Sequence, residues 1–275
     1  MYGILEKKIL NDTVQMMKVD APLIARKARP GQFIILRIDE TGERIPLTIA
    51  GFDRDAGTIT IIFQMVGKTT MKLGTLEEGD SIKDFVGPLG KASELEGYKS
   101  ACVIGGGLGT AIAFPQAKEL YELGADVDII AGFRSKDLII LEEEMKKTCR
   151  GLYITTDDGS NGRKGFVTDV LKELLKTRTY DVVIAIGPLV MMKFVSAITK
   201  EAGIKTIVSM NSVMVDGTGM CGGCRLTVGG ETKFACVDGP DFDGHLVDFD
   251  EAIMRSVRYK DEENHSCRLG GQING

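Results

Sequence analysis

Three of the six cysteines lie in one glycine-rich segment, and their spacing predicts a metal cluster. The segment MVDGTGMCGGCRLTVGGETKFACVDGP (214–240) places Asp216, Cys221, Cys224 and Cys236 in the pattern D-x4-C-x2-C-x11-C. With aspartate as the fourth anionic ligand, this pattern matches the plant-type [2Fe–2S] spacing, C-x4-C-x2-C and a distant cysteine. Glycines at 217, 219, 222 and 223 let the loop curl and leave N–H groups free to face the sulfurs. We therefore expect these four side chains to bind a [2Fe–2S] cluster.

Three other interpretations of this segment remain open. The same four residues could hold a structural zinc ion. Cys221 and Cys224 could form a thioredoxin-like redox pair, although the strand-to-helix setting of such a pair is missing. The thiols could also be incidental. A disulfide framework is disfavoured, because Cys102, Cys149 and Cys267 are scattered along the chain.

Two glycine turns that precede the cysteine-rich segment suggest a nucleotide site. GGGLGTA (105–111) follows the apolar run SACVIGG (100–106) and opens a helical stretch, where a helix N-terminus can hold a phosphate. It is not the G-x-G-x-x-G fingerprint, since Thr110 stands at the third glycine position. IGPLVMM (186–192) follows the strand YDVVIA, and its Gly–Pro pair allows a flat ligand to approach the backbone. The first turn alone could be an ordinary strand–helix turn, and the second a plain turn with core methionines. The order of the two turns along the chain is stronger evidence for a nucleotide site than either turn alone.

The elements that must position these residues fall into three stretches. Up to about residue 97, short apolar runs (31–39, 46–52 and 57–67) bounded by Gly, Asp and Pro predict an antiparallel β-barrel. Strands and helices then alternate (100–106, 110–124, 125–133, 151–158, 166–177, 180–187), which predicts a doubly wound parallel α/β domain. From about 210 we expect little regular structure until 250–260. The predicted units are 1–97, 98–209 and 210–275.

Composition excludes several classes of function. The 275 residues carry 34 Lys and Arg against 39 Asp and Glu, a net charge of −5, which argues against a nucleic-acid or anionic-membrane surface. No segment approaches the length of an apolar membrane span, and the charged N-terminus lacks a signal region, so we expect a cytoplasmic protein. The only histidines are His245 and His265, which makes an acid–base hydrolase hard to build.

The combination of motifs resembles one superfamily. PGQF (30–33), PLT (46–48), the GGGxG turn, the later GPxxM and the C-terminal cysteine loop occur together in ferredoxin reductases. The chain is most similar to their electron-transfer subunits that carry FAD and [2Fe–2S], as in dihydroorotate dehydrogenase B. The run from MVDGTGMCGGC to DGPDFDGHLVDFDEA narrows this to the small subunits of sulfide dehydrogenase, also described as electron-bifurcating NADH-dependent reduced ferredoxin:NADP oxidoreductase. In the dihydroorotate relatives the position of Asp216 is a cysteine.

The resemblance implies an FAD site in the barrel. The family motif R-P-L-S reads Ile45-Pro46-Leu47-Thr48 here, so Arg44 or Lys68 would have to neutralise the FAD phosphates. Thr48 would lie near the flavin N5, with Pro46, Leu47 and Ile49 lining the isoalloxazine. The segment FQMVGKTT (63–70) would hold the pyrophosphate, and its FAD-binding residues would be Phe63, Gln64, Gly67, Thr69 and Thr70.

The resemblance also implies an NAD(H) site and a partner. The dinucleotide-binding residues would be Gly105, Gly106, Gly107, Gly109, Thr110, Gly187, Pro188 and Met191. Asp157, beside Asp158, would repel a 2′-phosphate and favour NAD(H), whereas Arg134 argues the other way. The implied function is hydride exchange between NAD(H) and FAD, with single electrons passing through the cluster to a larger subunit of a heterodimer. The alternatives are a dihydroorotate dehydrogenase B electron-transfer subunit, or a zinc-stabilised, non-enzymatic binding module, which the loss of arginine at Ile45 would favour.

Overall fold

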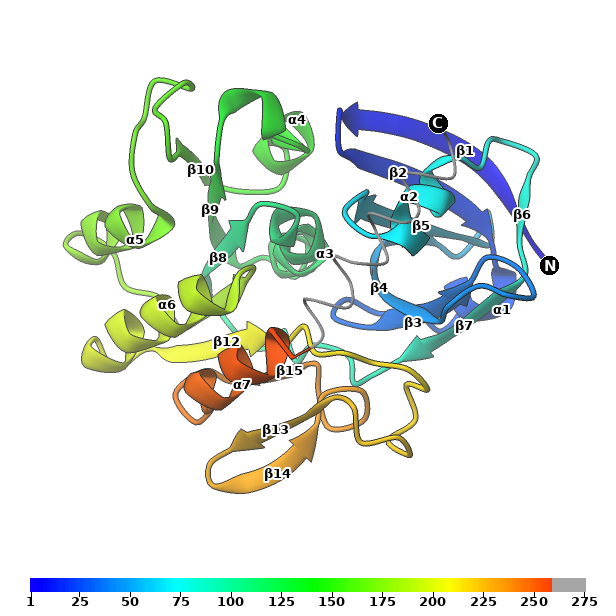
Figure 1. Cartoon of the computed structure of the whole chain (residues 1–275). Coiled ribbons are helices and arrows are strands. Elements are labelled where there is room, and N and C mark those ends of the chain that lie inside the picture. The colour runs from blue at the N-terminus through cyan, green and yellow to red at the C-terminus, as the bar shows by residue number, and fades with distance from the viewer. Residues whose placement is uncertain (259–275) are drawn as a thin grey trace.

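The first third of the chain forms a nearly closed antiparallel barrel. The computed structural model describes residues 1–258; residues 259–275, which include His265 and Cys267, lie outside the described part. The barrel strands run in the order β6-β1-β2-β5-β4-β3-β7. Its core is filled by large apolar side chains such as Ile34, Ile61, Phe63 and Phe85. The predicted barrel is confirmed (Figure 1), with these elements: β1 (Tyr2–Asn11), β2 (Val14–Asp20), α1 (Pro22–Ala25), β3 (Phe33–Arg37), β4 (Ile45–Asp53), β5 (Thr58–Gln64), α2 (Lys68–Gly74), β6 (Ser81–Ile82) and β7 (Asp84–Leu89).

The second sheet is parallel, as the alternation of strands and helices predicts. Its order is β10-β9-β8-β11-β12-β15, with only the edge strand β15 antiparallel. The chain winds in one direction from β8 and in the other from β11, so the crevice between their carboxyl ends is the expected ligand position. The strands are β8 (Ser100–Gly106), β9 (Asp126–Phe133), β10 (Gly151–Thr156), β11 (Val182–Ile186), β12 (Lys205–Ser209) and β15 (Asp241–Asp243).

Helices cover both faces of this sheet, and one of them also touches the barrel. Helix α3 (Gly109–Glu122) lies between the parallel sheet and the barrel (Figure 1). Its buried alanines share a core with Val14 and Ile62 of the barrel. The remaining helical elements are η1 (Lys136–Leu138), α4 (Glu142–Lys146), α5 (Val167–Leu175), α6 (Leu189–Glu201) and α7 (Phe249–Ser256). Within residues 1–258, none of the helices has the length and apolarity needed to cross a membrane.

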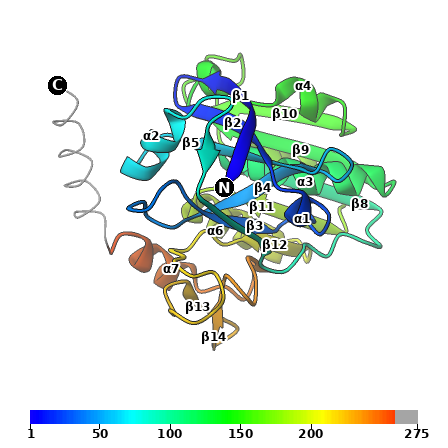
Figure 2. The same cartoon turned by 90° about the vertical axis from the view of Figure 1, so that its right-hand side faces the viewer.

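The cysteine-rich segment has more regular structure than the sequence suggested. It contains a hairpin, β13 (Arg225–Val228) and β14 (Glu231–Phe234), and then the strand β15, which pairs with β12. Gly229 and Gly230 form the hairpin turn at positive φ, and this glycine pair was the signal that could have revealed it. The expectation of little regular structure before residue 250 is therefore wrong. Figure 2 shows the hairpin projecting below the rest of the chain. The three unit boundaries remain a prediction.

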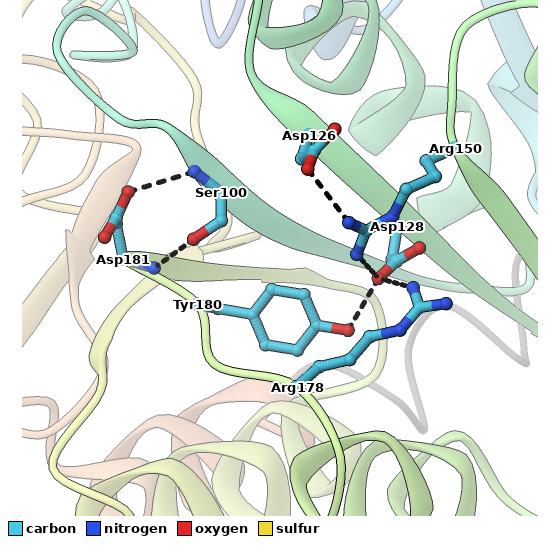
Figure 3. A network of polar contacts seen from close by, with 7 residues as sticks. All are labelled: Ser100, Asp126, Asp128, Arg150, Arg178, Tyr180 and Asp181. Atoms are coloured by element: carbon cyan, nitrogen blue, oxygen red, sulfur yellow. Dashed lines mark hydrogen bonds and ion pairs between the residues drawn. The ribbon is translucent and has the colours of Figure 1, made fainter.

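A buried carboxylate ties the amino ends of the parallel strands together. Asp128 of β9 has no exposed side-chain area and accepts hydrogen bonds from Arg178, from Tyr180 Oη at 2.7 Å and from Arg150 Nη2 at 3.1 Å (Figure 3). Arg150 also pairs with exposed Asp126 at 2.9 Å. This network lies at the edge of the sheet opposite the glycine turns, so it stabilises the sheet without taking part in binding there.

Replacing Asp128 by alanine should lower the free energy of unfolding by about 3–5 kcal/mol, because two arginines and a tyrosine hydroxyl lose their buried partner. The Asp126→Ala variant is the matched control, since Asp126 is 62% exposed. We expect it to cost less than about 1 kcal/mol. Urea unfolding followed by circular dichroism measures both; equal losses in the two variants would contradict the assignment.

The same network predicts a loss of stability in acid. Burial alone would raise the pKa of Asp128, but hydrogen bonds from Arg178, Tyr180 and Arg150 outweigh it and lower the pKa. The stabilisation is therefore complete above about pH 4, where the unfolded carboxylate is also ionised, and is lost as the pH falls below that value. The urea midpoint of the wild type should fall more steeply below about pH 4 than that of Asp128→Asn. Parallel pH profiles would refute this.

Candidate cofactor sites

Strand β4 presents two kinds of side chain, and only one kind is free to meet a ligand. Ile49 is 1% exposed and lies in the barrel core, and Leu47 packs against the same core. Pro46 and Thr48 alternate with them on the other face and are half-buried. Ala50, on that face, packs against the core that includes α3. Pro46 and Thr48 can therefore offer side chains to a flavin. Leu47 is half-buried against the barrel core, and Ile49 can offer only its backbone.

The proposed pyrophosphate turn precedes α2. The Thr70 hydroxyl accepts the N–H groups of Val66 at 3.1 Å and Gly67 at 3.0 Å, so the Gly67 N–H is already bonded. Thr69 Oγ1 donates to Glu43 Oε2 at 2.5 Å. The N–H groups of Thr69 and Thr70 lie in the first helical turn, where no intrahelical acceptor exists, so they fit a phosphate better than Gly67 does.

The other residues of this segment are divided between core and surface. Phe63 is fully buried among the barrel side chains, while Gln64, next in the strand, is half-buried on the opposite face. Arg44 is used elsewhere than expected: its Nε donates to the carbonyl of Val215 at 3.0 Å, in the cysteine-rich segment. Lys68 is the first residue of α2 and directly follows Gly67 of the proposed pyrophosphate turn, so it is the cation adjacent to that turn in the sequence.

The two predicted dinucleotide turns come together at the crevice between β8 and β11. A Cβ atom on Gly106 would lie 2.6 Å from Met191 Sδ and 2.9 Å from Pro188 Cδ. A Cβ on Gly187 would lie 3.1 Å from the Gly106 backbone. Glycine at both positions therefore allows the turns to contact each other directly.

The first turn also needs glycine to start α3 where it does. A Cβ on Gly109 would lie 2.3 Å from the carbonyl oxygen of Ile186, and one on Gly105 would lie 2.5 Å from Thr110 Cα. Thr110 is 1% exposed, and its Oγ1 has no hydrogen-bond partner among the described residues. A buried, unpaired hydroxyl in the first turn of a helix fits a site that a phosphate completes.

One contributor to this turn was missed from the sequence. The Gly107 N–H donates to the carbonyl of Gly132 at 2.8 Å, at the end of β9. A Cβ on Gly132 would lie 2.5 Å from Val167 Cγ1. Its signal was a glycine at the carboxyl end of a buried strand in AGF (131–133), where the backbone approaches a neighbour closely.

Asp157 and Asp158 have different environments. The Asp158 carboxylate accepts the N–H of Ser160 at 2.9 Å and its hydroxyl at 2.7 Å, and these bonds lower the pKa of Asp158. The Asp158 carboxylate therefore stabilises the turn that contains Ser160. Asp157 donates its N–H to the Phe133 carbonyl at 3.0 Å, while its exposed carboxylate follows β10 at the carboxyl edge of the sheet. Of the two, Asp157 is the one available to a ribose.

The four predicted cluster ligands form two pairs. Cys221 Sγ lies 3.0 Å from Asp216 Oδ1, and Cys224 Sγ lies 3.2 Å from Cys236 Sγ. Cys224 and Cys236 are each 1% exposed, whereas Cys221 is exposed. Burial and the neighbouring Cys224 raise the pKa of Cys236 to about 12, an effect that a bound cation reverses because it favours the thiolate.

The geometry of these pairs fits two irons better than one zinc ion. Within residues 1–258, no three His, Cys, Asp or Glu side chains are grouped so that they could hold a single metal ion. A [2Fe–2S] cluster has two metal centres, each with two protein ligands, which matches two pairs of donors. Gly217, Gly219 and Gly222 have positive φ, so glycine is required in the loop that carries Asp216, Cys221 and Cys224.

The redox-pair interpretation is also disfavoured. Cys221 and Cys224 lie in a turn rather than at the start of a helix. Each lies within hydrogen-bonding distance of a different residue, Cys221 of Asp216 and Cys224 of Cys236. The donor set of three thiols and one carboxylate in a glycine loop therefore fits an iron–sulfur cluster.

The fold and the site together define a class. Residues 211–248 match the family model described as the iron–sulfur cluster binding domain of dihydroorotate dehydrogenase B. An antiparallel barrel, a parallel α/β sheet with glycine turns at its switch point and this segment define an oxidoreductase subunit of the ferredoxin-reductase type. FAD, NAD(H) and a [2Fe–2S] cluster are the cofactors and substrate of this class.

Similar proteins place the chain within that class. It is 54% identical over 272 residues to an uncharacterised protein of Clostridium beijerinckii (96% of this chain and 92% of the relative). It is 45% identical to the dihydroorotate dehydrogenase B (NAD(+)) electron transfer subunit homologue of Thermotoga maritima (94% of each). A chain of the solved NADH-dependent reduced ferredoxin–NADP oxidoreductase, from work on flavin-based electron bifurcation, aligns with a TM-score of 0.92 and 44% identity (97% of this chain and 96% of the other). The chain belongs to the family of dihydroorotate dehydrogenase B-type electron-transfer subunits.

Proposed function

We propose that this subunit exchanges hydride between NAD(H) and FAD and passes single electrons through a [2Fe–2S] cluster to a larger partner subunit. One observation carries the proposal: the dinucleotide turn and the cysteine-rich segment each pack against the barrel that would hold the flavin, through two separate cores. Helix α3, which begins at the dinucleotide turn, shares a core with the barrel and packs against Ala50 of the flavin strand. Cys224 and Cys236 share another core with Phe33 and Ile35 of the barrel.

The barrel would hold FAD, which supplies the conversion between a two-electron hydride and single electrons. The side chains of Pro46 and Thr48 and the backbone of Leu47 and Ile49 would face the isoalloxazine. Backbone N–H groups at Thr69 and Thr70 would bind the pyrophosphate, with Lys68 adjacent. The protein's contribution is to position the flavin, and no general base is required.

The glycine turns would bind NAD(H) at the crevice between β8 and β11. The Gly105–Gly109 turn and the Thr110 hydroxyl would bind its phosphates, and Gly187, Pro188 and Met191 would contact the nicotinamide end. The exposed Asp157 carboxylate would favour the ribose hydroxyls of NAD(H) over the 2′-phosphate of NADP(H).

The cluster loop offers a route to the partner. Cys221 is exposed, and the loop around it carries exposed apolar side chains: Val213 (48%), Val215 (49%) and Met220 (88%). Exposed apolar side chains gathered around a predicted redox centre are typical of a surface that docks another protein. We therefore propose that the larger subunit contacts this loop.

One residue of this chain distinguishes between two candidate partners. Asp216 stands where dihydroorotate relatives have cysteine, so it favours the NADH-dependent ferredoxin:NADP oxidoreductase (sulfide dehydrogenase) type, in which bifurcation is expected. The 44% identity and TM-score of 0.92 to the solved protein of that name support this choice. A dihydroorotate dehydrogenase B partner is the alternative, and the name of the Thermotoga maritima relative supports it.

The subunit without its partner should oxidise NADH with artificial electron acceptors such as ferricyanide. It should not reduce NADP⁺ or polysulfide, because the proposal assigns those reactions to the larger subunit. Steady-state assays with NADH and NADPH, at matched concentrations, measure both the activity and the preference. No NADH oxidation by protein with bound flavin would contradict the proposal; NADP⁺ reduction by the lone subunit would contradict the division of labour.

A further inference from the structure

Ser93, Gln116 and Asp241 join three parts of the chain through one ring of hydrogen bonds. Ser93 follows the last barrel strand, Gln116 lies on α3, and Asp241 opens β15. Ser93 Oγ donates to Asp241 Oδ2 at 2.6 Å. Gln116 Nε2 donates to Ser93 Oγ at 2.8 Å and to Asp241 Oδ2 at 3.2 Å. The ring therefore connects the barrel, the dinucleotide helix and the cysteine-rich segment.

Gly31 of the PGQF motif provides the space for this ring. Its φ is +84°, and a Cβ there would lie 2.1 Å from Ser93 Oγ and 3.2 Å from Asp241 Oδ2. The next residue, Gln32, accepts the Ile49 N–H at 3.0 Å through its carbonyl. Gly31, which contacts the ring, is therefore the neighbour in sequence of Gln32, whose backbone bonds to the flavin strand β4.

On the other side, the ring is close in sequence to a cluster ligand. Asp241 is five residues after Cys236. Between them, the Gly239 carbonyl accepts the Lys91 N–H at 2.7 Å and the Pro240 carbonyl accepts the Met210 N–H at 2.9 Å. The path from Cys236 to Asp241 is therefore bonded to the segment that follows the barrel and to the residue that follows β12.

The environment of Asp241 is costly for a carboxylate. Gln116 is 0% and Ser93 5% exposed, and Asp241 Oδ1 is shielded from solvent without a partner among the described residues. Burial raises the pKa of Asp241, and the hydrogen bonds from Ser93 and Gln116 oppose this effect; neither donor is a cation. If packing alone were needed, an apolar side chain would stabilise this junction at least as well. A carboxylate instead accepts donors from several elements and so specifies their relative positions.

We propose that Asp241 is a positioning residue for electron transfer, which fixes the Cys236 segment relative to the barrel and α3. This inference rests on the proposed function. NADH gives up two electrons as a hydride and becomes NAD⁺; the two electrons leave through the cluster one at a time, and the proton is released to water. Because electron tunnelling slows steeply with distance, a displaced cluster segment delays only the second stage. Hydride exchange takes place between the barrel and the dinucleotide turn, which lie outside the displaced segment.

Anaerobic stopped-flow mixing with NADH separates the two stages in the complete subunit. Flavin bleaching reports hydride exchange, and rapid-freeze electron paramagnetic resonance reports cluster reduction. For Asp241→Asn and Gln116→Leu we expect flavin bleaching within about twofold of the wild type and cluster reduction slower by about tenfold, because a small displacement of a reacting centre has a large effect on rate. The double variant should be no slower than the slower single one, because both changes break one ring. Asp181→Asn is the control, since Asp181 accepts the N–H groups of Lys99 and Ser100 at the far edge of the sheet (Figure 3).

Hydrogen–deuterium exchange gives a measurement that requires no turnover. The amides of Lys91 and Met210 bond to the Gly239 and Pro240 carbonyls, so they report the position of this segment directly. They should exchange faster in Asp241→Asn and Gln116→Leu than in the wild type, and at the wild-type rate in Asp181→Asn.

The outcomes distinguish the two proposals. A wild-type subunit in which NADH bleaches the flavin but never reduces the cluster contradicts the proposed function, and the role of Asp241 falls with it. A wild type that completes both stages, with variants that reduce the cluster at the same rate, overturns the role of Asp241 alone. Equal slowing of both stages also overturns it, because it indicates a general loss of structure.

Discussion

Changing Cys224 to serine should remove the iron from the purified subunit while leaving its flavin in place. Cys224 is 1% exposed and lies 3.2 Å from Cys236, so its thiol is half of one ligand pair. A serine hydroxyl at this position is a much weaker ligand than a thiolate, and one iron would lose a protein ligand. We expect the iron content to fall from about two atoms per chain to near zero. NADH should still bleach the flavin, because the barrel and the glycine turns are unchanged.

Iron and flavin analysis, with electron paramagnetic resonance of the dithionite-reduced protein, measures this effect. Cys149→Ser is the matched control, because Cys149 is a half-buried free thiol outside the cysteine-rich segment. It should retain both the iron and the resonance signal. If the Cys224 variant keeps its iron, or if the control loses it, the ligand assignment is wrong.

The second large effect is expected for Gly109→Ala at the dinucleotide turn. The new methyl group would lie 2.3 Å from the Ile186 carbonyl oxygen and 2.8 Å from Gly187 Cα; both are backbone atoms, so the turn must move. The start of α3 and the Thr110 hydroxyl would move with it. We expect the KM for NADH to rise by at least about tenfold, equivalent to about 1.4 kcal/mol of lost binding. Iron and flavin contents should be unchanged.

Gly3→Ala provides the comparison, because a Cβ on Gly3 meets nothing within 4 Å. Steady-state NADH oxidation with ferricyanide gives the KM of each variant. A Gly109 variant with the wild-type KM would show that NAD(H) binds elsewhere, and a raised KM in the Gly3 variant would show that the assay reports general stability.

Much of the fold could be predicted because its patterns are local. The barrel strands are short apolar runs between turn residues, and the parallel strands are continuous apolar runs such as SACVIGG. The cluster spacing could be predicted for a similar reason, since three of its four ligands come from one loop. The glycine turns could be found separately, but their contact through Gly106 and Met191 depends on β8 and β11 becoming neighbours.

The remainder depends on contacts between distant parts of the chain. The strand β15 pairs with β12, and no local pattern in three residues specifies that pairing. Ile49 was expected to line the flavin, but its side chain lies in the barrel core, because the strand alternates and the core takes Leu47 and Ile49. Arg44 was a candidate for the FAD phosphates, yet it donates to Val215, which is 171 positions away. The individual binding residues remain predictions.

The most direct test of this account is the ultraviolet–visible spectrum of anaerobically purified subunit, with iron, zinc and flavin counted on the same sample. We predict flavin bands over a broad iron–sulfur absorption, with about two irons and about one FAD per chain and no zinc. A colourless protein with about one zinc per chain would contradict the electron-transfer function and leave a zinc-stabilised binding module.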